Sequence, residues 1–390
     1  AVEERHEFLD VLRGFALLGI VLANMHSLSL YVYQPPAVRA AMTGRVDRAL
    51  EFLELVLVEG KFYTIFSVLF GIGFSILMGR AEAKGLAFRR FFLRRALLLF
   101  LIGALHAVLF WHNDILESYA FCGALLLAFA PASNRTVLLT AGLALFAPAA
   151  LKWAGLLQRG ALSPPRAAIL GRFGYTADDR MRLWTEGSYV DGVIANAASW
   201  FGQVDYVVAS GMLFRILGLF LVGLYLGRKA FHRDLAAHAA LLARVAVAGI
   251  AVGLPLNVAY ARQFEGEGWA HELLVTVAVP PLSAGYVALL GLAWVRTGGG
   301  TLREVFAPVG RMALTNYVGQ SAIALLVFRS AGLGLGGRAG VTEYLLIGLA
   351  IYVVQLAASR AWMAHFRFGP LEWLWRMLTY GSWLSLSRRR

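Results

Sequence analysis

The stretch "ALHAVLFWHNDILESYAFCGALLLAF" at residues 104–129 contains two apolar runs separated by a short polar corner. His106 lies inside the first run, and the corner ends at Asp114. Apolar runs with so few polar interruptions are typical of hydrophobic helices that cross a membrane. We therefore predict two such helices here, near 94–111 and 115–131, joined by the corner.

The whole chain has the same apolar character. Hydrophobic residues make up 59% of its 390 residues and charged residues only 15%, whereas roughly 45–50% of a soluble domain is apolar. The mean hydropathy is +0.65. Runs close to the ~20 residues that cross a bilayer recur along the chain. The sequence predicts an all-α, polytopic transmembrane bundle of about ten helices, near residues 9–28, 56–79, 94–111, 115–131, 136–154, 205–227, 237–259, 272–295, 308–328 and 342–363.

Basic residues collect in short segments between the apolar runs, for example "RAEAKGLAFRRFFLRR" at 80–95 and "GRKAFHRD" at 227–234. With an even number of spans, these segments fall on one side of the membrane together with both ends of the chain. Because Lys and Arg are enriched on the cytoplasmic side, we predict cytoplasmic N- and C-termini in a bacterial cytoplasmic (inner) membrane. The enrichment of Lys and Arg in cytoplasmic segments then accounts for the net charge of +13, and no nucleic-acid partner is expected.

We expect four parts along the chain. Residues 1–154 form an N-terminal helix bundle with the candidate site. Residues 155–204 form an extracytoplasmic cap, because paired prolines, aromatic rings and mixed charges favour an ordered segment. Residues 205–365 form a C-terminal bundle. Residues 366–390, rich in Trp and ending in arginines, form a cytoplasmic interfacial tail.

Small residues recur at every fourth position of the second apolar run, and the same spacing returns later in the chain: Ser67, Gly71, Ser75, Gly79, Gly223 and Gly227. Residues four apart share one helix face, and small side chains there let two helices approach closely. We expect these residues to lie at helix–helix contacts and assign them no chemistry.

Several catalytic motifs are missing from the sequence. It contains no phosphate-binding GxxxxGK[ST], no HExxH and no GxSxG, which argues against ATP hydrolysis, zinc proteolysis and serine hydrolysis of the usual kinds. The single cysteine, Cys122, excludes an intrachain disulfide and a multi-cysteine metal site. We expect no metal.

His106 lies about 8 Å below the end of its predicted helix, at roughly 1.5 Å rise per residue. An imidazole there can move protons near neutral pH, or it can simply hydrogen-bond across helices. Asp114 also has two interpretations: it can orient the histidine, or it can cap the next helix, whose first turn carries Glu117. The sequence leaves these alternatives open, and one carboxylate can fill both roles.

Other polar side chains lie close to the expected helix ends. His26 ends the first span and His112 lies in the corner, and both are expected mainly as interfacial histidines. Glu59 and Lys61 open the second span. Because they are two residues apart, they do not share a helix face, and Lys61 is expected to snorkel to the surface.

Arg215 lies near the middle of the span predicted at 205–227. A guanidinium at that depth needs a carboxylate, carbonyl groups or a wet cavity. We expect it to line an internal cavity, or to pair with a carboxylate such as Glu59. A polar face in the ninth span is consistent with a hydrated interior and consists of Asn316, Tyr317, Gln320 and Ser321.

At the predicted cytoplasmic mouth, Asp10 and Arg13 are neighbours on one helix face. Four further arginines lie a few helices away: Arg89, Arg90, Arg94 and Arg95. Topology signals and one ion pair would explain these residues. The functional alternative is a rim that attracts phosphate, because Arg is suited to forked recognition of phosphate groups.

Five blocks occur in order along nearly the whole chain: "LDVLRGFALLGIVLANM" at 9–25, "EGKFYTIFSVLFGIGF" at 59–74, "IGALHAVLFWHNDILESYAFCG" at 102–123, "PVGRMALTNYVGQS" at 308–321 and "FRFGPLEWLWRMLTYG" at 366–381. Together they resemble the YeiB-like family of bacterial membrane proteins, also called domain of unknown function 418. That family is similar to the transmembrane acyltransferase superfamily, which includes the lysosomal heparan-α-glucosaminide N-acetyltransferase and bacterial glucan-modifying enzymes.

The resemblance implies an activity. Such relatives carry an acyl group from cytoplasmic acyl-CoA to an acceptor on the far side of the membrane. The shared "LDVLRG…N" opening is matched by Asp10, Arg13, Gly14 and Asn24. Other branches place a histidine near the end of the first helix, where this chain has Asn24. The candidate base is therefore His106, or His26 by local compensation.

The resulting hypothesis is a membrane-embedded acyltransferase. Acyl-CoA, first of all acetyl-CoA, is the expected co-substrate. Its phosphates are expected near Arg13 and the cluster of Arg89, Arg90, Arg94 and Arg95, and Arg215 is a further expected acyl-CoA contact. The expected catalytic residues are His106, Asp114 and His26, and the oxyanion or acceptor contacts are Asn24, Tyr119, Glu59 and Lys61. The acceptor would be a hydroxyl or amine of an extracytoplasmic saccharide or lipid.

Two other readings use the same residues. A transporter or lipid flippase would use the buried polar groups to move substrate or protons. A scaffold would recruit partners through its aromatic tail and cap. Membrane lipids are expected partners in every case, and a homodimer is compatible with the sequence.

Overall fold

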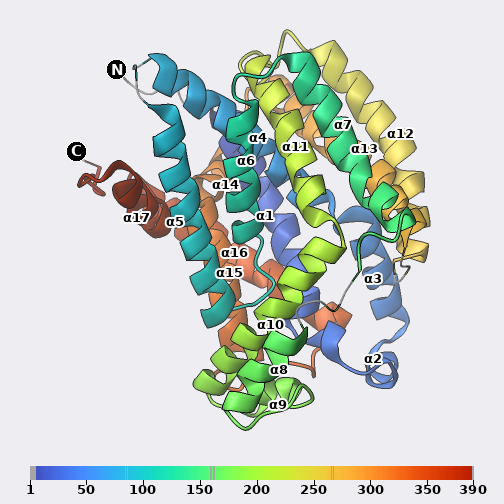
Figure 1. Cartoon of the computed structure of the whole chain (residues 1–390). Helices are drawn as coiled ribbons and strands as arrows, with labels where there is room; N and C mark the ends of the chain where they lie inside the picture. Colours follow the sequence, from blue (N-terminus) through green and yellow to red (C-terminus); the bar gives the residue numbers. More distant parts are fainter. Residues whose placement is uncertain are drawn as a thin grey trace.

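The computed structural model describes residues 6–388 apart from positions 84, 86, 159, 161, 162, 265 and 267. The described residues form helices joined by short loops, with no β-strand among them (Figure 1). The prediction of an all-α helical bundle is confirmed. Residues 1–5 of the predicted N-terminal part and the last two arginines of the predicted tail lie outside the described part.

In chain order the longer helices are α1 (Glu7–Leu28), α4 (Lys61–Ala83), α5 (Phe88–Leu109), α7 (Asn134–Trp153), α10 (Tyr189–Ala209), α11 (Met212–Arg228), α12 (Ala239–Arg262), α13 (Trp269–Thr297), α15 (Ala313–Phe328) and α16 (Val341–His365). The shorter helices are α2 (Pro36–Met42), α3 (Arg45–Leu57), α6 (Leu116–Leu126), α8 (Ser163–Arg172), α9 (Arg180–Thr185), α14 (Gly300–Arg311) and α17 (Pro370–Tyr380).

Hydropathy and length make this a multi-pass membrane protein. Among the residues described, 7 helices are long and apolar enough to cross a bilayer, and the bent pair α10–α11 gives up to 8. Two shorter apolar helices, Leu116–Phe129 and Ala313–Phe328, coincide with two further predicted spans. Every predicted span thus coincides with a helix or a helix pair, while the number that crosses the membrane stays a prediction.

The span predicted at 205–227 is not one straight helix. The chain bends by 64° between α10 and α11, where Gly211 has a φ of 66°. That left-handed conformation is cheap only for glycine, and it ends one helix and starts the next. Arg215 consequently lies in the first turn of α11 and not in the middle of one continuous helix.

The stripe of small residues does bring two helices together. A Cβ added at Gly71 of α4 would lie 2.0 Å from the carbonyl oxygen of Phe220, and one at Gly223 of α11 would lie 2.1 Å from that of Val68. The predicted helix–helix contact is confirmed at these positions. Gly79 is the exception, because nothing lies within 4 Å of its added Cβ.

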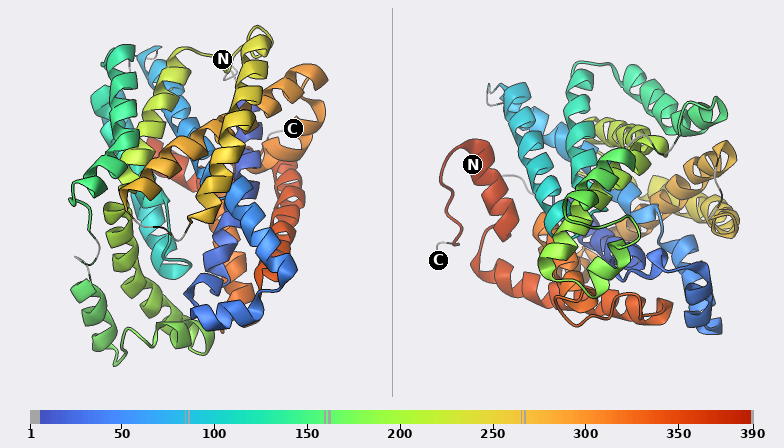
Figure 2. Two further views of the ribbon diagram at one scale, coloured as in Figure 1. Left: turned by 90° about the vertical axis from the view of Figure 1, so that its right-hand side faces the viewer. Right: turned by 60° about the horizontal axis from the view of Figure 1, so that its bottom comes forward.

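The two ends of the bundle differ. Both chain termini lie toward one end, together with α17, whereas α2, α8, α9 and the start of α10 form the opposite end (Figure 1). Figure 2, right, shows this opposite end turned toward the viewer. Much of the predicted cap segment, 155–204, therefore lies on the end away from the termini, and α1 runs between the two ends.

Candidate functional site

A large cavity of about 2150 Å³ reaches toward both ends of the bundle. Its wall includes Asp10 and Arg13 from the start of α1, and Asn24 and His26 from the end of the same helix. Arg13 and Asn24 are 11 residues apart, which is roughly 16 Å along a helix axis. The cavity therefore follows most of the length of α1.

One end of the cavity carries what we call the arginine rim, which consists of Arg13, Arg80, Arg95, Arg311, Arg367, Arg376 and Arg388. The guanidinium of Arg95 lies 3.5 Å from the ring centre of Trp375, and the Trp375 indole N–H donates to the Arg95 carbonyl over 3.0 Å. These contacts attach α17 to α5, so the C-terminal segment forms part of the wall.

The rim has few carboxylates. Asp10 pairs with Arg13 at 2.8 Å, as the spacing predicts. Glu372 accepts hydrogen bonds from the backbone N–H groups of Leu314 (2.6 Å) and Thr315 (3.1 Å). The seven arginines thus outnumber these two carboxylates, and this part of the cavity wall carries an excess of positive charge.

The six arginines predicted to contact acyl-CoA do not lie together. Arg13 and Arg95 belong to the rim, but Arg89, Arg90 and Arg94 are exposed and do not line the cavity. They lie on other faces of α5, since only one face of a helix can point inward. Arg311, Arg367 and Arg376, which come from distant segments, were not predicted.

The opposite end carries what we call the polar corner, formed by Asn24, His26, Trp111, His112, Asn113 and Asp114. Asp114 is its most heavily bonded member. Its Oδ1 lies 3.1 Å from Nδ1 of His106 and accepts from the hydroxyl of Tyr317 at 3.0 Å. Its Oδ2 accepts from the backbone N–H of Leu116 at 3.1 Å. The carboxylate thus contacts the histidine, as predicted, and accepts from the first N–H of α6. The N-cap residue of α6 is Ile115, so the prediction that Asp114 is itself the N-cap was wrong.

His106 lies behind Asp114. Its side chain is only 1% exposed, and it is not part of the cavity wall. Because a carboxylate can only accept, the contact places a proton on Nδ1, and Nε2 has no partner among the described residues. Asp114 belongs to the cavity wall although its side chain is 0% exposed, and His106 supports it from the protein side.

His26 and His112 were expected as interfacial histidines, and the structure places both on the cavity wall. Nε2 of His26 has no hydrogen-bond partner in the described part of the chain. His112 stacks on Trp184 at 5.2 Å, and its Nε2 lies 3.2 Å from the Tyr33 hydroxyl. Asn113 donates to the same hydroxyl at 3.1 Å. The corner is therefore a connected polar surface.

Tyr119 lines the cavity between the two ends. Its hydroxyl lies 2.7 Å from the hydroxyl of Ser67 and donates to the carbonyl of Tyr63 at 3.1 Å. Both partners belong to α4, so the phenol is held in one position. Asn24, the other predicted oxyanion donor, lies farther along the wall, in the polar corner.

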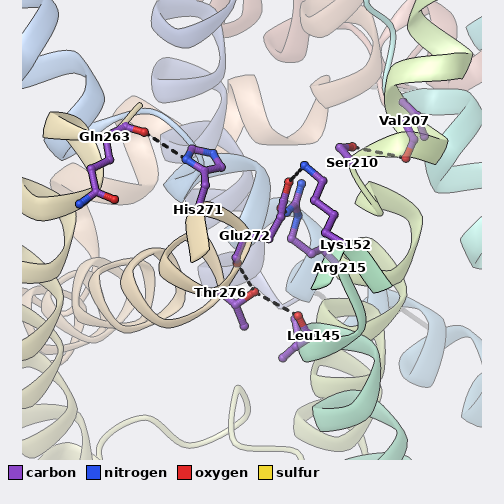
Figure 3. A network of polar contacts seen from close by, with 9 residues as sticks. All are labelled: Leu145, Lys152, Val207, Ser210, Arg215, Gln263, His271, Glu272 and Thr276. Carbon is purple, nitrogen blue, oxygen red and sulfur yellow. Dashed lines mark hydrogen bonds and ion pairs between the residues drawn. The ribbon is translucent and has the colours of Figure 1, made fainter. Parts of the chain in front are cut away.

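A side lobe of the cavity lies beside the α10–α11 bend and includes Glu59, Tyr63, Tyr206, Arg215, Tyr260, His271 and Glu272. Arg215 lines the cavity, as one prediction had it, but its carboxylate partner is Glu272 and not Glu59. Glu272 also accepts from Nζ of Lys152 at 2.6 Å (Figure 3). One buried carboxylate thus joins α7, α11 and α13.

The prediction for Lys61 was wrong. Its side chain is 0% exposed, and Nζ donates to the carbonyl of Leu55 at 2.7 Å. It also lies 5.4 Å from the ring centre of Tyr260. The ammonium does not snorkel, because the α3–α4 turn supplies a carbonyl acceptor and an aromatic face inside the protein. Glu59 lines the side lobe, away from the polar corner.

Comparison with known proteins gives relatives over nearly the full length. The family described as "Protein of unknown function (DUF418)" matches residues 226–382. The chain is 30% identical to the uncharacterized protein YxaH of Bacillus subtilis over 99% of this chain and 97% of that protein. It is 32% identical to an uncharacterized protein of Bacillus acidopullulyticus (97% and 95% covered) and 30% identical to the uncharacterized protein YeiB of Escherichia coli (96% of each). No solved structure matches.

Proposed function

The chain belongs to the YeiB-like DUF418 family of bacterial membrane proteins, and from this starting point we propose that it is a membrane-embedded acyltransferase. It would move an acetyl or other short acyl group from cytoplasmic acyl-CoA to a hydroxyl or amine of an extracytoplasmic saccharide or lipid. We place it in the bacterial inner membrane with the arginine rim on the cytoplasmic side. The observation that carries the proposal is the single cavity that joins the rim to the polar corner.

The rim supports the donor half of the proposal. Guanidinium groups bind phosphate through paired N–H donors, and acyl-CoA carries several phosphates at its nucleotide end. Trp375 and Phe368 lie among these arginines on the cavity wall, where a nucleobase could stack on an aromatic face. Arg13 and Arg95 keep the role predicted for them, and Arg311, Arg367 and Arg376 replace the exposed arginines of α5.

The length of the cavity supports transfer between its ends. A ligand held at Arg13 must span roughly 16 Å to reach Asn24. Acyl-CoA has its reactive thioester at the end of a long flexible arm, far from its phosphates. The phosphates can therefore stay at the rim while the thioester lies at the polar corner.

At the corner the acceptor oxygen or nitrogen attacks the thioester carbonyl, the C–S bond breaks, and the thiolate of CoA takes up a proton as it leaves. His26 is the proposed general base, because the residue lines the cavity and its Nε2, which is buried in the ligand-free structure, has no partner in the described part. The amide of Asn24 would donate to the developing oxyanion. Asp114 would hold the acceptor, with His106 as its positioning residue.

Ligand-dependent stability tests the donor half. Acetyl-CoA at 100 times its Kd should stabilise the full-length protein by about 2.7 kcal/mol, because it binds only the folded state. Arg95→Gln should weaken this effect, and Arg89→Gln, an exposed position on the same helix, should leave it intact. No stabilisation by acetyl-CoA, or equal losses in the two variants, would contradict the proposal.

Transport of a substrate or lipid is the second candidate. The α10–α11 pair is broken beside a buried arginine, and transporters use such interrupted helices to build substrate sites. The two functions differ in their products. Incubation of membranes with radiolabelled acetyl-CoA leaves covalently bound label if the protein is a transferase, and only unmodified substrate on the far side if it is a transporter.

A further inference from the structure

A second group of arginines lies beside the polar corner, on the end of the bundle opposite the rim. We call Arg166, Arg180 and Arg329 the corner arginines. Arg180 lies 5.2 Å from the ring centre of Tyr33 and 5.3 Å from that of Trp184. Arg329 lies 4.4 Å from the ring centre of Trp184. They come from α8, α9 and the segment after α15, so the fold gathers them from distant parts of the chain.

Two of these arginines have buried nitrogen atoms without a hydrogen-bond partner in the described part of the chain. Arg329 is 6% exposed, and both its Nη1 and Nη2 have no hydrogen-bond partner among the described residues. Nε of Arg166 is also unpartnered there. In contrast, the buried Arg215 has Glu272 as its partner. A buried cation without a carboxylate is costly, so the cluster calls for an anion from outside the described residues.

The three positive charges converge on His112. Burial, and then Arg329, Arg180 and Arg166, lower the pKa of this histidine well below its ordinary value. Burial also lowers the pKa of Arg329 to about 9. His112 is therefore neutral near pH 7, and its Nδ1 has no hydrogen-bond partner in the described part. Two of the arginines, Arg166 and Arg180, line the cavity together with this ring.

We propose that the corner arginines bind a phosphate group carried by the acceptor, so that the acceptor is a phosphate-bearing saccharide or lipid. This inference rests on the proposed function, since it assigns the substrate class of the same cavity. Phosphate suits the site because it offers several acceptor oxygens to forked guanidinium donors. Arg166 and Arg180 contact the phosphate from the cavity wall, while Arg329, on the face of Trp184, adds positive charge behind them.

The experiment uses the full-length protein in detergent and measures its thermal unfolding. The probes are inorganic phosphate and glycerol 1-phosphate, each compared with chloride at equal ionic strength. Both should stabilise the wild type, and Arg180→Gln should weaken the binding about 10- to 100-fold, the effect of losing one charge-assisted hydrogen bond. Arg182→Gln is the matched control, because Arg182 lies two positions away, is exposed and pairs with Asp179 at 2.8 Å.

The arginine rim can also bind phosphate, and Arg95→Gln separates the two sites. Stabilisation by phosphate that survives in Arg95→Gln and disappears in Arg180→Gln supports the corner site. Stabilisation that Arg180→Gln leaves unchanged overturns it. Bilayer discs of phosphatidylglycerol and of phosphatidylcholine identify the molecule that carries the phosphate. If phosphatidylglycerol alone gives a stabilisation that depends on Arg180, the phosphate belongs to a lipid headgroup. If glycerol 1-phosphate alone gives it, the phosphate belongs to a soluble molecule. Either supports the proposal.

A structural role for the cluster predicts a different result. If the arginines only hold the fold together, Arg329→Gln lowers the stability of the ligand-free protein and leaves phosphate binding as it was, and this outcome overturns the proposal. If they form an anion site, removing one unpaired cation leaves ligand-free stability unchanged or higher. Acetyl-CoA binding is measured on the same samples. If acetyl-CoA does not bind but phosphate binding still depends on Arg180, the acyltransferase proposal is refuted and the phosphate site is not.

Discussion

Replacing Glu272 by Gln tests the buried ion-pair network most sharply. The carboxylate is 3% exposed and holds Lys152 of α7 and Arg215 of α11 at once (Figure 3). Gln keeps the size of the side chain but removes the negative charge and puts an NH₂ group where one of the two cations now donates. Both cations then remain inside the protein without compensation.

The structure sets the size of the effect. Lys152 and Arg215 are only 17% and 11% exposed in their side chains, so solvent screens the loss weakly. Removing one partner of a buried ion pair costs about 3–5 kcal/mol. Lys152→Gln should cost less, about 1.5–3 kcal/mol, because the Arg215–Glu272 pair stays neutral. Replacing all three residues by Met or Leu should bring the stability back close to that of the wild type.

The assay is the free energy of unfolding in detergent micelles, determined by denaturant titration. The control is Glu304→Gln, an exposed position on α14 that should change the free energy by at most about 0.5 kcal/mol. Two results would refute the reasoning: a Glu272→Gln variant that is as stable as the control, or a Lys152→Gln variant that is less stable than Glu272→Gln.

Three further predictions concern packing, catalysis and pH. Gly71→Ala should destabilise the protein by about 1–3 kcal/mol, because the added Cβ would lie 2.0 Å from a carbonyl oxygen. Gly79→Ala should be neutral or slightly stabilising, because its Cβ meets nothing within 4 Å. Equal effects of the two variants in unfolding titrations would contradict the close contact of α4 and α11 at Gly71. His26→Gln should lower the rate of acyl transfer about 10²–10⁴-fold without changing the affinity for acetyl-CoA. His106→Gln should lower the rate less. If a radiolabel assay gives the opposite order, His106 is the general base and His26 the positioning residue. Burial and nearby arginines lower the pKa of His112 well below 6.5, so the unfolded chain binds a proton that the folded chain does not, and stability falls as the pH drops below about 6.5. His112→Gln should therefore reduce that acid-induced loss, measured as unfolding free energy at pH 7 and pH 5, and an unchanged slope would argue against this origin.

The features predicted correctly from the sequence are local ones. In a bilayer, an apolar run of sufficient length satisfies its backbone hydrogen bonds by forming a helix, so each predicted span has a helix or a helix pair. Small residues four positions apart, such as Ser67, Gly71 and Ser75, similarly mark a close contact, because the pattern depends on one helix face alone. The ion pair between Asp10 and Arg13 follows from a spacing of three residues.

The features that were missed depend on contacts across the chain. The break before Arg215 lies in the continuous apolar stretch "VVASGMLFRILG" at 207–218, where only the φ of Gly211 distinguishes two helices from one. The partner of Arg215 lies 57 positions away, and no local pattern selects Glu272 over Glu59.

The orientation of individual helices was also beyond the sequence. His106 and Asp114 were predicted as a pair, and they do contact each other. Which of them belongs to the cavity wall depends on the rotation of α5 and on the path of the corner. Both residues contact Tyr317, which lies far away in the sequence. For the same reason the arginines of α5 divide, with Arg95 in the rim and Arg89 on the surface.

The central claim is that one cavity connects a nucleotide site at the arginine rim with a reaction site at the polar corner. The most direct measurement is an electron cryomicroscopy structure of the full-length protein with a thioether analogue of acetyl-CoA. We predict nucleotide density between Arg13 and Arg95, with the acyl end of the analogue beside Asn24. Nucleotide density outside the cavity would contradict the claim. So would an acyl end that stays at the rim because the cavity is closed before it reaches Asn24.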